Sequence, residues 1–138
     1  MVRSREEVLP SMKRILIADD QAAARELLRT ILVNSGYEVL EAVDGNDATA
    51  QLNKVRPDLV LLDIHMPGKD GFEVCAFIRN HPELANVPVI ALTAGLMSGE
   101  REKAISAGFT DFVGKPVAIS ALRQTVTRLL QSNAAPAG

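Results

Sequence analysis

The chain has 138 residues, the size of one ordinary domain, and its 47% of hydrophobic residues excludes an intrinsically disordered protein. The formal net charge of -2, with no dense group of Lys and Arg, gives no reason to expect nucleic-acid binding. A single cysteine, Cys75, excludes an intramolecular disulfide, and no apolar run is long enough to span a membrane. We therefore expect a soluble, cytoplasmic protein that binds neither nucleic acid nor membranes.

The first half of the chain predicts two strands, each followed by a helix. Residues 13–18, which are apolar from Ile15 onward, predict the first strand, and the helix after it ends at Gly36. This helix has apolar residues at helical spacing, at Ala24, Leu27, Leu28, Ile31 and Leu32. Residues 37–43 predict a second strand. A turn over residues 44–46 then leads into a weaker helix that runs on to Pro57.

The most informative stretch begins with the unbroken apolar run 59–62. A run this short and uniform is typical of a parallel strand covered by helices on both faces. It ends in a carboxylate, Asp63, and a loop with Pro67, Gly68 and Gly71 follows. Open α/β sheets place ligand sites at the carboxyl ends of their strands, so Asp63 is a candidate site residue. Taken alone, this stretch equally fits an aspartate that caps the following turn.

The remainder of the chain continues the alternation. A third helix is expected over residues 71–80, a fourth strand over 87–92 and a polar helix over 98–107. A fifth strand over 109–113 and a last helix over 119–130 complete the pattern.

Five strands that alternate with five helices through short connections predict a parallel sheet with helices on both faces, because such crossovers are right-handed. We predict one doubly wound α/β domain over residues 13–131. Residues 1–12 are expected to form an N-terminal leader, and the small residues within 132–138 are expected to form a flexible tail.

Polar residues stand at the end of four predicted strands. They are Asp19 and Asp20 after the first, Asp63 after the third, Thr93 after the fourth and Lys115 after the fifth. Carboxylates crowded together need a compensating cation, and hard oxygen ligands favour Mg²⁺. A hydroxyl and an ammonium beside that ion suit the oxygens of a phosphoryl group.

Each residue alone also fits a plain structural role. Asp20 fits the N-cap of the first helix, Thr93 an ordinary strand end and Lys115 a surface lysine. Coincidence of all five at one edge of the sheet is improbable, so we favour a functional site.

Four segments that contain these polar residues are similar to those of a known family. They are residues 17–20, 61–71, 89–94 and 111–116. With them the chain resembles the receiver domains of two-component response regulators, close to the chemotaxis-type single-domain regulators, over about residues 13–131. The resemblance implies a flavodoxin-like three-layer fold with strand order 2-1-3-4-5.

The resemblance also implies roles for the acidic residues. Asp63 is expected to be the phosphoacceptor, which takes its phosphoryl group from a sensor histidine kinase or a histidine phosphotransfer protein. Asp20, Asp63 and the backbone carbonyl of His65 are expected to bind Mg²⁺ directly, and Asp19 through a water molecule.

The switch residues follow from the same resemblance. Thr93 is expected to bind the acyl phosphate, and Lys115, which precedes a cis peptide to Pro116, is expected to pair with its oxygens. Phe112 is expected to rotate inward as Thr93 moves, although plain core packing of Phe112 is the alternative. The surface of the fourth helix, fifth strand and fifth helix would then change and bind a downstream protein or, on phosphorylation, a second copy of the chain.

Two positions in such proteins tune the lifetime of the phosphoryl group, and here they hold His65 and Gly95. Glycine has no side chain to orient an attacking water, and histidine can shield the phosphoryl group or pair with it. We expect slow self-hydrolysis.

Two other functions remain open at this point. One is an adaptor with receiver fold that is never phosphorylated. The other is a phosphatase of the haloacid dehalogenase type, which is disfavoured because Asp19 and Asp20 are adjacent and no cap domain is present. We do not expect an enzyme that acts on other molecules. The chain is expected to catalyse only its own phosphorylation and its own slow dephosphorylation.

Overall fold

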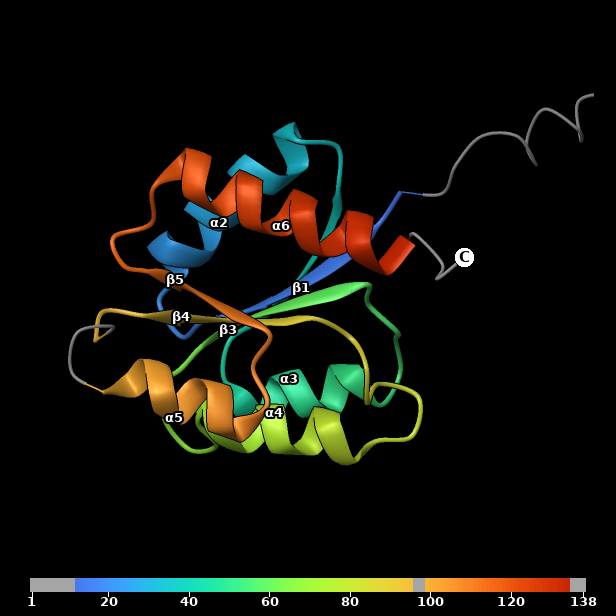
Figure 1. The fold of residues 1–138 in the computed structure, drawn as a ribbon, viewed down its shortest axis with the longest axis vertical. Helices are drawn as coiled ribbons and strands as arrows, with labels where there is room; N and C mark the ends of the chain where they lie inside the picture. Colours follow the sequence, from blue (N-terminus) through green and yellow to red (C-terminus); the bar gives the residue numbers. More distant parts are fainter. Residues whose placement is uncertain (1–11, 96–98, 135–138) are drawn as a thin grey trace, which may run out of the picture.

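The computed structural model describes residues 12–95 and 99–134 (Figure 1). Its strands are β1 (Arg14–Ala18), β2 (Glu38–Ala42), β3 (Leu59–Asp63), β4 (Val89–Thr93) and β5 (Asp111–Gly114). Its helices are α2 (Ala22–Asn34), α3 (Gly45–Leu52), α4 (Gly71–Asn80), α5 (Glu100–Ala107) and α6 (Ile119–Ala134).

The strands form one parallel sheet in the order β2-β1-β3-β4-β5. Helices α2 and α6 cover one face of this sheet, and α3, α4 and α5 cover the other (Figure 1). This arrangement confirms the predicted doubly wound, three-layer α/β fold with its strand order.

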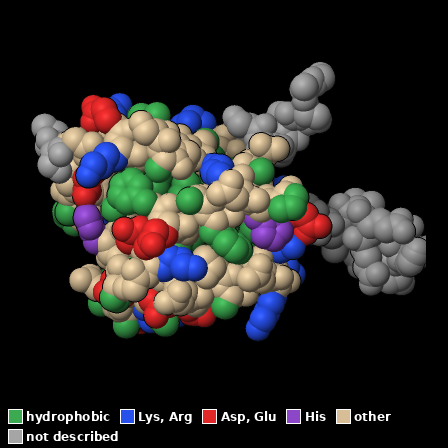
Figure 2. Space-filling view, turned by 90° about the horizontal axis from the view of Figure 1, so that it is seen from below, with side chains coloured by type: hydrophobic (Ala, Val, Ile, Leu, Met, Phe, Trp, Pro, Cys, Tyr) green, Lys and Arg blue, Asp and Glu red, His purple; other side chains and the backbone are tan. Residues whose placement is uncertain are grey.

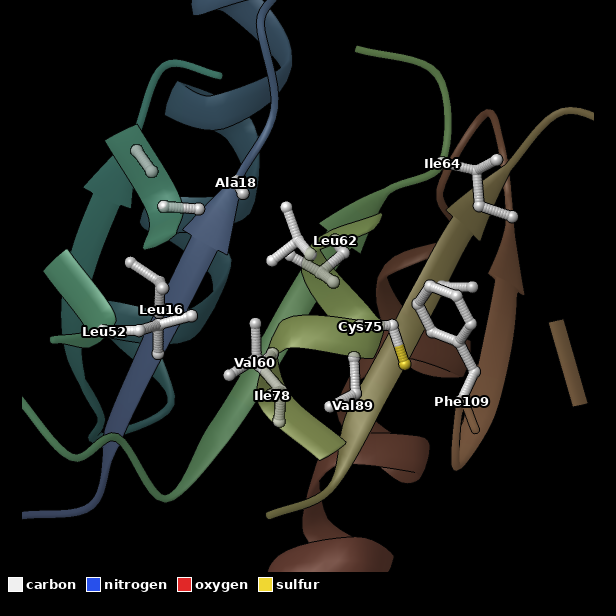
Figure 3. Close-up of a cluster of buried hydrophobic side chains, with 14 of the residues drawn as sticks. Leu16, Ala18, Leu52, Val60, Leu62, Ile64, Cys75, Ile78, Val89 and Phe109 are labelled. Atoms are coloured by element: carbon white, nitrogen blue, oxygen red, sulfur yellow. The ribbon is translucent and has the colours of Figure 1, made fainter. Parts of the chain in front are cut away.

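Strand β3 lies in the middle of the sheet and is buried on both faces. Leu59 and Leu61 pack into the core under α2 and α6, whereas Val60 and Leu62 pack into the core against α3 and α4. Figure 3 shows the second core, in which Val60 lies beside Ile78 of α4. Burial of one such side chain stabilises the fold by about 1.5–3 kcal/mol, so the sheet interior holds the end of β3 firmly in place.

Helix α4 begins with a capping box directly after the loop that follows β3. The Asp70 carboxylate accepts the backbone N–H of Glu73, and the Glu73 carboxylate accepts the backbone N–H of Asp70. The next residue, Gly71, lies so close to β3 that a Cβ there would stand 2.6 Å from the carbonyl oxygen of Asp63. Only glycine therefore allows α4 to start this close to the end of β3.

The predicted turn after β2 is in fact the start of α3. The carboxylate of Asp44 accepts the N–H of Asp47 at 2.8 Å, which makes Asp44 an N-cap and not a turn residue. The helix also ends at Leu52 instead of running on to Pro57, because the next N–H groups turn back to the carbonyl of Gln51.

The predicted C-terminal boundary was too early. Helix α6 continues to Ala134, so the first three residues of the expected tail, 132–134, are helical. The rest of that tail, 135–138, and residues 1–11 of the expected leader over 1–12 lie outside the described residues.

Other differences are small. Leu27, predicted in the apolar stripe of its helix, is 49% exposed, while Leu28 one position on is buried. The fifth strand starts at Asp111, not at Phe109, because the N–H of Phe109 closes α5 by bonding to the carbonyl of Ala104. The predicted start of α5, Ser98, lies outside the described residues.

The surface mixes charges of both signs. On the face formed by α3, α4 and α5, acidic and basic side chains are interspersed with hydrophobic ones (Figure 2). Within residues 12–95 and 99–134, none of the helices combines the length and apolarity that crossing a membrane requires.

Candidate functional site

Four strands bring the predicted site residues to one edge of the sheet. Asp19 follows β1 and Asp63 ends β3, while Thr93 ends β4 and Lys115 follows β5. Asp19, Asp63 and Thr93 are buried, with exposed fractions of 0%, 6% and 1%. Asp20 is exposed beside them. The structure therefore brings together residues that lie far apart in the chain, as the strand-end argument predicts.

Lys115 links the two buried carboxylates. Its Nζ lies 3.0 Å from Oδ2 of Asp19 and 3.1 Å from Oδ2 of Asp63. Its backbone N–H donates to the carbonyl of Thr93 at 2.9 Å, which ties β5 to β4 at the site. The peptide between Lys115 and Pro116 is cis, as the resemblance implied. Lys115 is thus an integral part of this edge and not an ordinary surface lysine.

The second oxygen of each buried carboxylate is held by the backbone. Oδ1 of Asp19 accepts the N–H of Gln21 at 2.9 Å, and Oδ1 of Asp63 accepts the N–H of His65 at 3.0 Å. Both carboxylates are therefore oriented by main-chain donors in the loops that follow their own strands, which fixes the direction in which their remaining lone pairs point.

The acidic residues have the composition of a site for a divalent cation. Oxygens of Asp19, Asp20 and Asp63 lie within 4.8 Å of one another. With Lys115 protonated, three carboxylates and one ammonium leave two net negative charges among these side chains, which one Mg²⁺ would neutralise. Asp20 is not the N-cap of α2, a position held by Gln21. The carboxylate of Asp20 therefore does not cap this helix and could contribute to a cation site.

Burial and pairing shift the pKa values of the central pair. Burial is the largest effect on Asp63 and raises its pKa, with a smaller contribution from Asp19, although the N–H of His65 and the ammonium of Lys115 act against the rise. Burial alone would lower the pKa of Lys115, but its bonds to Asp19 and Asp63 outweigh this and raise it. Lys115 is therefore charged at neutral pH.

Thr93 is bound to a residue that the sequence analysis did not single out. Its hydroxyl donates to Oε1 of Glu100 and accepts the N–H of Gly95 at 2.9 Å. The other oxygen of Glu100 lies 2.7 Å from Nε2 of His65. Glu100 thus connects the two predicted positions Thr93 and His65. It stands in a polar helix without a clear pattern, so only the three-dimensional structure could identify it.

Phe112 lies on β5, half-buried, and packs against the core under α3, α4 and α5. The guanidinium carbon of Arg101 lies 4.7 Å from the centre of its ring, which is a cation–π contact. Core packing and the predicted switch role both fit this position.

Comparison with known proteins decides the family. The family described as the response regulator receiver domain matches residues 15–127, most of the chain. The chain belongs to the response regulator receiver family. Receiver domains of this family are the phosphoacceptor modules of two-component systems, and the geometry of the strand edge is consistent with that role.

Two curated relatives set the scale of the similarity. The response regulator PleD of Caulobacter vibrioides is 40% identical over 104 residues, which are 75% of this chain and 23% of PleD. The polar-differentiation response regulator DivK of Brucella anthropi is 32% identical over 118 residues, which are 86% of this chain and 96% of DivK. The chain thus spans less than a quarter of PleD and nearly all of DivK.

Solved structures agree with the fold. The chemotaxis response regulator CheY4 of Vibrio cholerae superimposes with a TM-score of 0.82 at 29% identity, over 86% of this chain and 99% of that one. The receiver domain of the sensor histidine kinase PA1611 from Pseudomonas aeruginosa PAO1 gives 0.82 at 30% identity, over 88% and 99%. That second structure has a magnesium ion coordinated in its active site cleft.

Proposed function

We propose that the chain takes a phosphoryl group onto Asp63 from the phosphohistidine of a sensor histidine kinase or a histidine phosphotransfer protein. The observation that carries this proposal is the Lys115 ammonium, which lies within hydrogen-bonding distance of both Asp19 and Asp63 at the strand edge. A carboxylate oxygen of Asp63 attacks phosphorus, the phosphorus–nitrogen bond breaks and its electron pair returns to the imidazole. The product is an acyl phosphate.

The residues around Asp63 supply positioning and charge neutralisation, which phosphoryl transfer needs more than covalent help. The carboxylates of Asp20 and Asp63 and the backbone carbonyl of His65 would hold Mg²⁺, and Asp19 would act through a water molecule. When bound, the ion would neutralise the negative charge that gathers on the transferred group. Lys115 would pair with its oxygens.

The output of this reaction is a change in a surface. Thr93 would move toward the phosphoryl group, and Phe112 would turn into the space that Thr93 leaves. The surface formed by α5, β5 and α6 would then bind a downstream protein or a second copy of the chain. The support for this route is the position of Phe112, which packs against the core on β5 beside the strand that carries Thr93.

The family assignment favours this function over a haloacid dehalogenase-type phosphatase. The chain would catalyse only its own phosphorylation and the slow loss of the phosphoryl group. The adaptor alternative makes the opposite prediction about phosphate uptake, so one experiment separates the two.

The test uses phosphoramidate as a small phosphoryl donor and intact mass as the readout. Wild-type protein should gain one phosphoryl group when Mg²⁺ is present and none when it is chelated. Asp63→Asn should gain none in either condition. Uptake by Asp63→Asn, or no uptake by the wild type, would support the adaptor or another acceptor.

A further inference from the structure

Glu100, the first residue of α5, bonds to two residues of the phosphoacceptor region at once. Its Oε1 accepts the hydroxyl proton of Thr93, and its Oε2 lies 2.7 Å from Nε2 of His65. Thr93 lies at the end of β4, whereas His65 lies in the loop after β3. One carboxylate therefore joins the two loops that border Asp63.

The bond to Glu100 competes with the role proposed for Thr93. A threonine hydroxyl has a single proton to donate, and here that proton is committed to a carboxylate, which is a stronger acceptor than a neutral oxygen. The lone pairs of the same hydroxyl accept the N–H of Gly95. Thr93 cannot donate to a phosphoryl oxygen on Asp63 until Glu100 gives up this bond.

Phosphorylation adds negative charge to Asp63, and this charge acts on the same contact. An anion on Asp63 attracts the Thr93 proton and repels the carboxylate of Glu100. Both effects favour release of Glu100.

We propose that Glu100 is a positioning residue that withholds the Thr93 hydroxyl until an anion occupies the phosphoryl position on Asp63. The inference rests on the proposed function and adds to it a residue that sets how readily the switch is turned on. The unphosphorylated form is stabilised by Glu100, and the phosphorylated form must first displace it.

The position of Glu100 in α5 transmits this exchange to the surface. The N-cap of α5, Gly99, offers no side-chain hydrogen bond, so the contacts of Glu100 hold the first turn of the helix against the site. The next residue, Arg101, lies over the ring of Phe112. Release of Glu100 therefore loosens the same turn that contacts Phe112.

Binding of beryllofluoride, a stand-in for the phosphoryl group, tests the inference. Affinity is measured by calorimetry with Mg²⁺ present, for the wild type, Glu100→Gln and Glu100→Ala. Loss of the competing carboxylate should tighten binding about five-fold in Glu100→Ala and less in Glu100→Gln, which keeps one acceptor oxygen. Glu102→Gln is the matched control, because Glu102 is an exposed acid in the same helical turn and lines a groove with Phe72.

The dependence on Thr93 separates a specific contact from general charge repulsion. In a Thr93→Val background the Glu100→Ala gain should shrink to that of Glu102→Gln, because the hydroxyl on which Glu100 acts is gone and only general charge repulsion remains. A gain that persists undiminished in this background, or an equal gain in Glu102→Gln, would overturn the inference while leaving the proposed function intact. Absence of binding by the wild type and by every variant would overturn both.

Discussion

A lysine between two buried carboxylates dominates the electrostatics at the residue scale. Lys115 neutralises part of the charge of Asp19 and Asp63, but the three carboxylates of the cluster still exceed the positive charge beside them. Burial raises the pKa of Asp63, and the charge of Asp19 adds a smaller part to this rise. The same imbalance that would favour a bound cation is expected to lower the stability of the metal-free protein.

With Mg²⁺ removed by a chelator, the stability of the wild type should depend on the ionisation of Asp63. Its pKa in the folded protein lies above the ordinary value of 3.8, so the folded protein binds this proton more tightly than the unfolded chain. The protonated Asp63 carboxyl therefore adds to the free energy of unfolding at low pH. This contribution is lost as the pH rises through the raised pKa of Asp63.

Asp63→Asn has no carboxyl group to ionise at this position, so it does not lose this stability as the pH rises. It should therefore be more stable than the wild type at neutral pH, by about 1 kcal/mol. Urea denaturation of both proteins across the pH range measures the difference. Equal stability at every pH would show that the Asp63 charge carries no cost in the fold.

The lifetime of the phosphoryl group also belongs to the residue scale. Gly95 has no side chain to orient a water molecule, so the wild type is expected to lose its phosphoryl group slowly. Gly95→Asn adds an amide at this position and should speed hydrolysis by at least about three-fold. The decay of the phosphorylated mass after removal of the donor measures the hydrolysis rates of the wild type and of Gly95→Asn. Equal rates would contradict a role of Gly95 in slow hydrolysis.

At the scale of elements, the site depends on how closely α4 approaches β3. A Cβ at Gly71 would stand 2.6 Å from the carbonyl oxygen of Asp63, so Gly71→Ala must displace either the helix or the strand end. We expect a loss of about 2 kcal/mol in the free energy of unfolding. We also expect slower phosphorylation of the protein by phosphoramidate.

Gly36→Ala is the control for this substitution. Gly36 has φ of +97°, so alanine is strained there, but the added Cβ meets no atom within 4 Å. It should lower stability by about 1 kcal/mol without changing the uptake of phosphate. Slower uptake in both variants would mean that lost stability, and not displacement of Asp63, explains the effect.

The elements also show how far sequence reasoning reaches. The uniform run before Asp63 predicted a strand buried on both faces, and α4 was placed correctly because glycine begins it and His81-Pro82 follows it. The start of α3 was missed because Asp44 before a glycine is as typical of a turn as of an N-cap.

The contacts at the sheet edge were predictable only in part. The convergence of Asp19 and Lys115 followed from topology, since parallel strands end at one edge. The bond between Glu100 and Thr93 depends on where one side chain of a short polar helix points, and no periodicity in the sequence encodes that direction.

At the scale of the whole molecule, a bound cation should stabilise the fold. Mg²⁺ that binds only the folded protein raises the free energy of unfolding, by about 2.7 kcal/mol when its free concentration is 100 times its dissociation constant. The midpoint of thermal unfolding of the wild type should therefore rise with Mg²⁺. Asp20→Asn should lose most of this rise, whereas Glu26→Gln, an exposed acid on α2, should keep it.

An equal rise in Asp20→Asn and Glu26→Gln would show that Mg²⁺ acts on the surface in general and not on the acidic cluster. That result would mean that the acidic cluster does not bind Mg²⁺ specifically. The fold and the family assignment would be unchanged.

Asp63 is the residue expected to carry the phosphoryl group, and chemical trapping tests this most directly. Wild-type protein is phosphorylated with phosphoramidate and Mg²⁺, reduced with borohydride and digested, and its peptides are sequenced by mass spectrometry. Borohydride converts an acyl phosphate to an alcohol, so homoserine in place of Asp63, absent without the donor, is the predicted result. Homoserine at another aspartate, the corresponding alcohol at a glutamate, or neither product while the intact mass shows phosphorylation, would contradict this assignment.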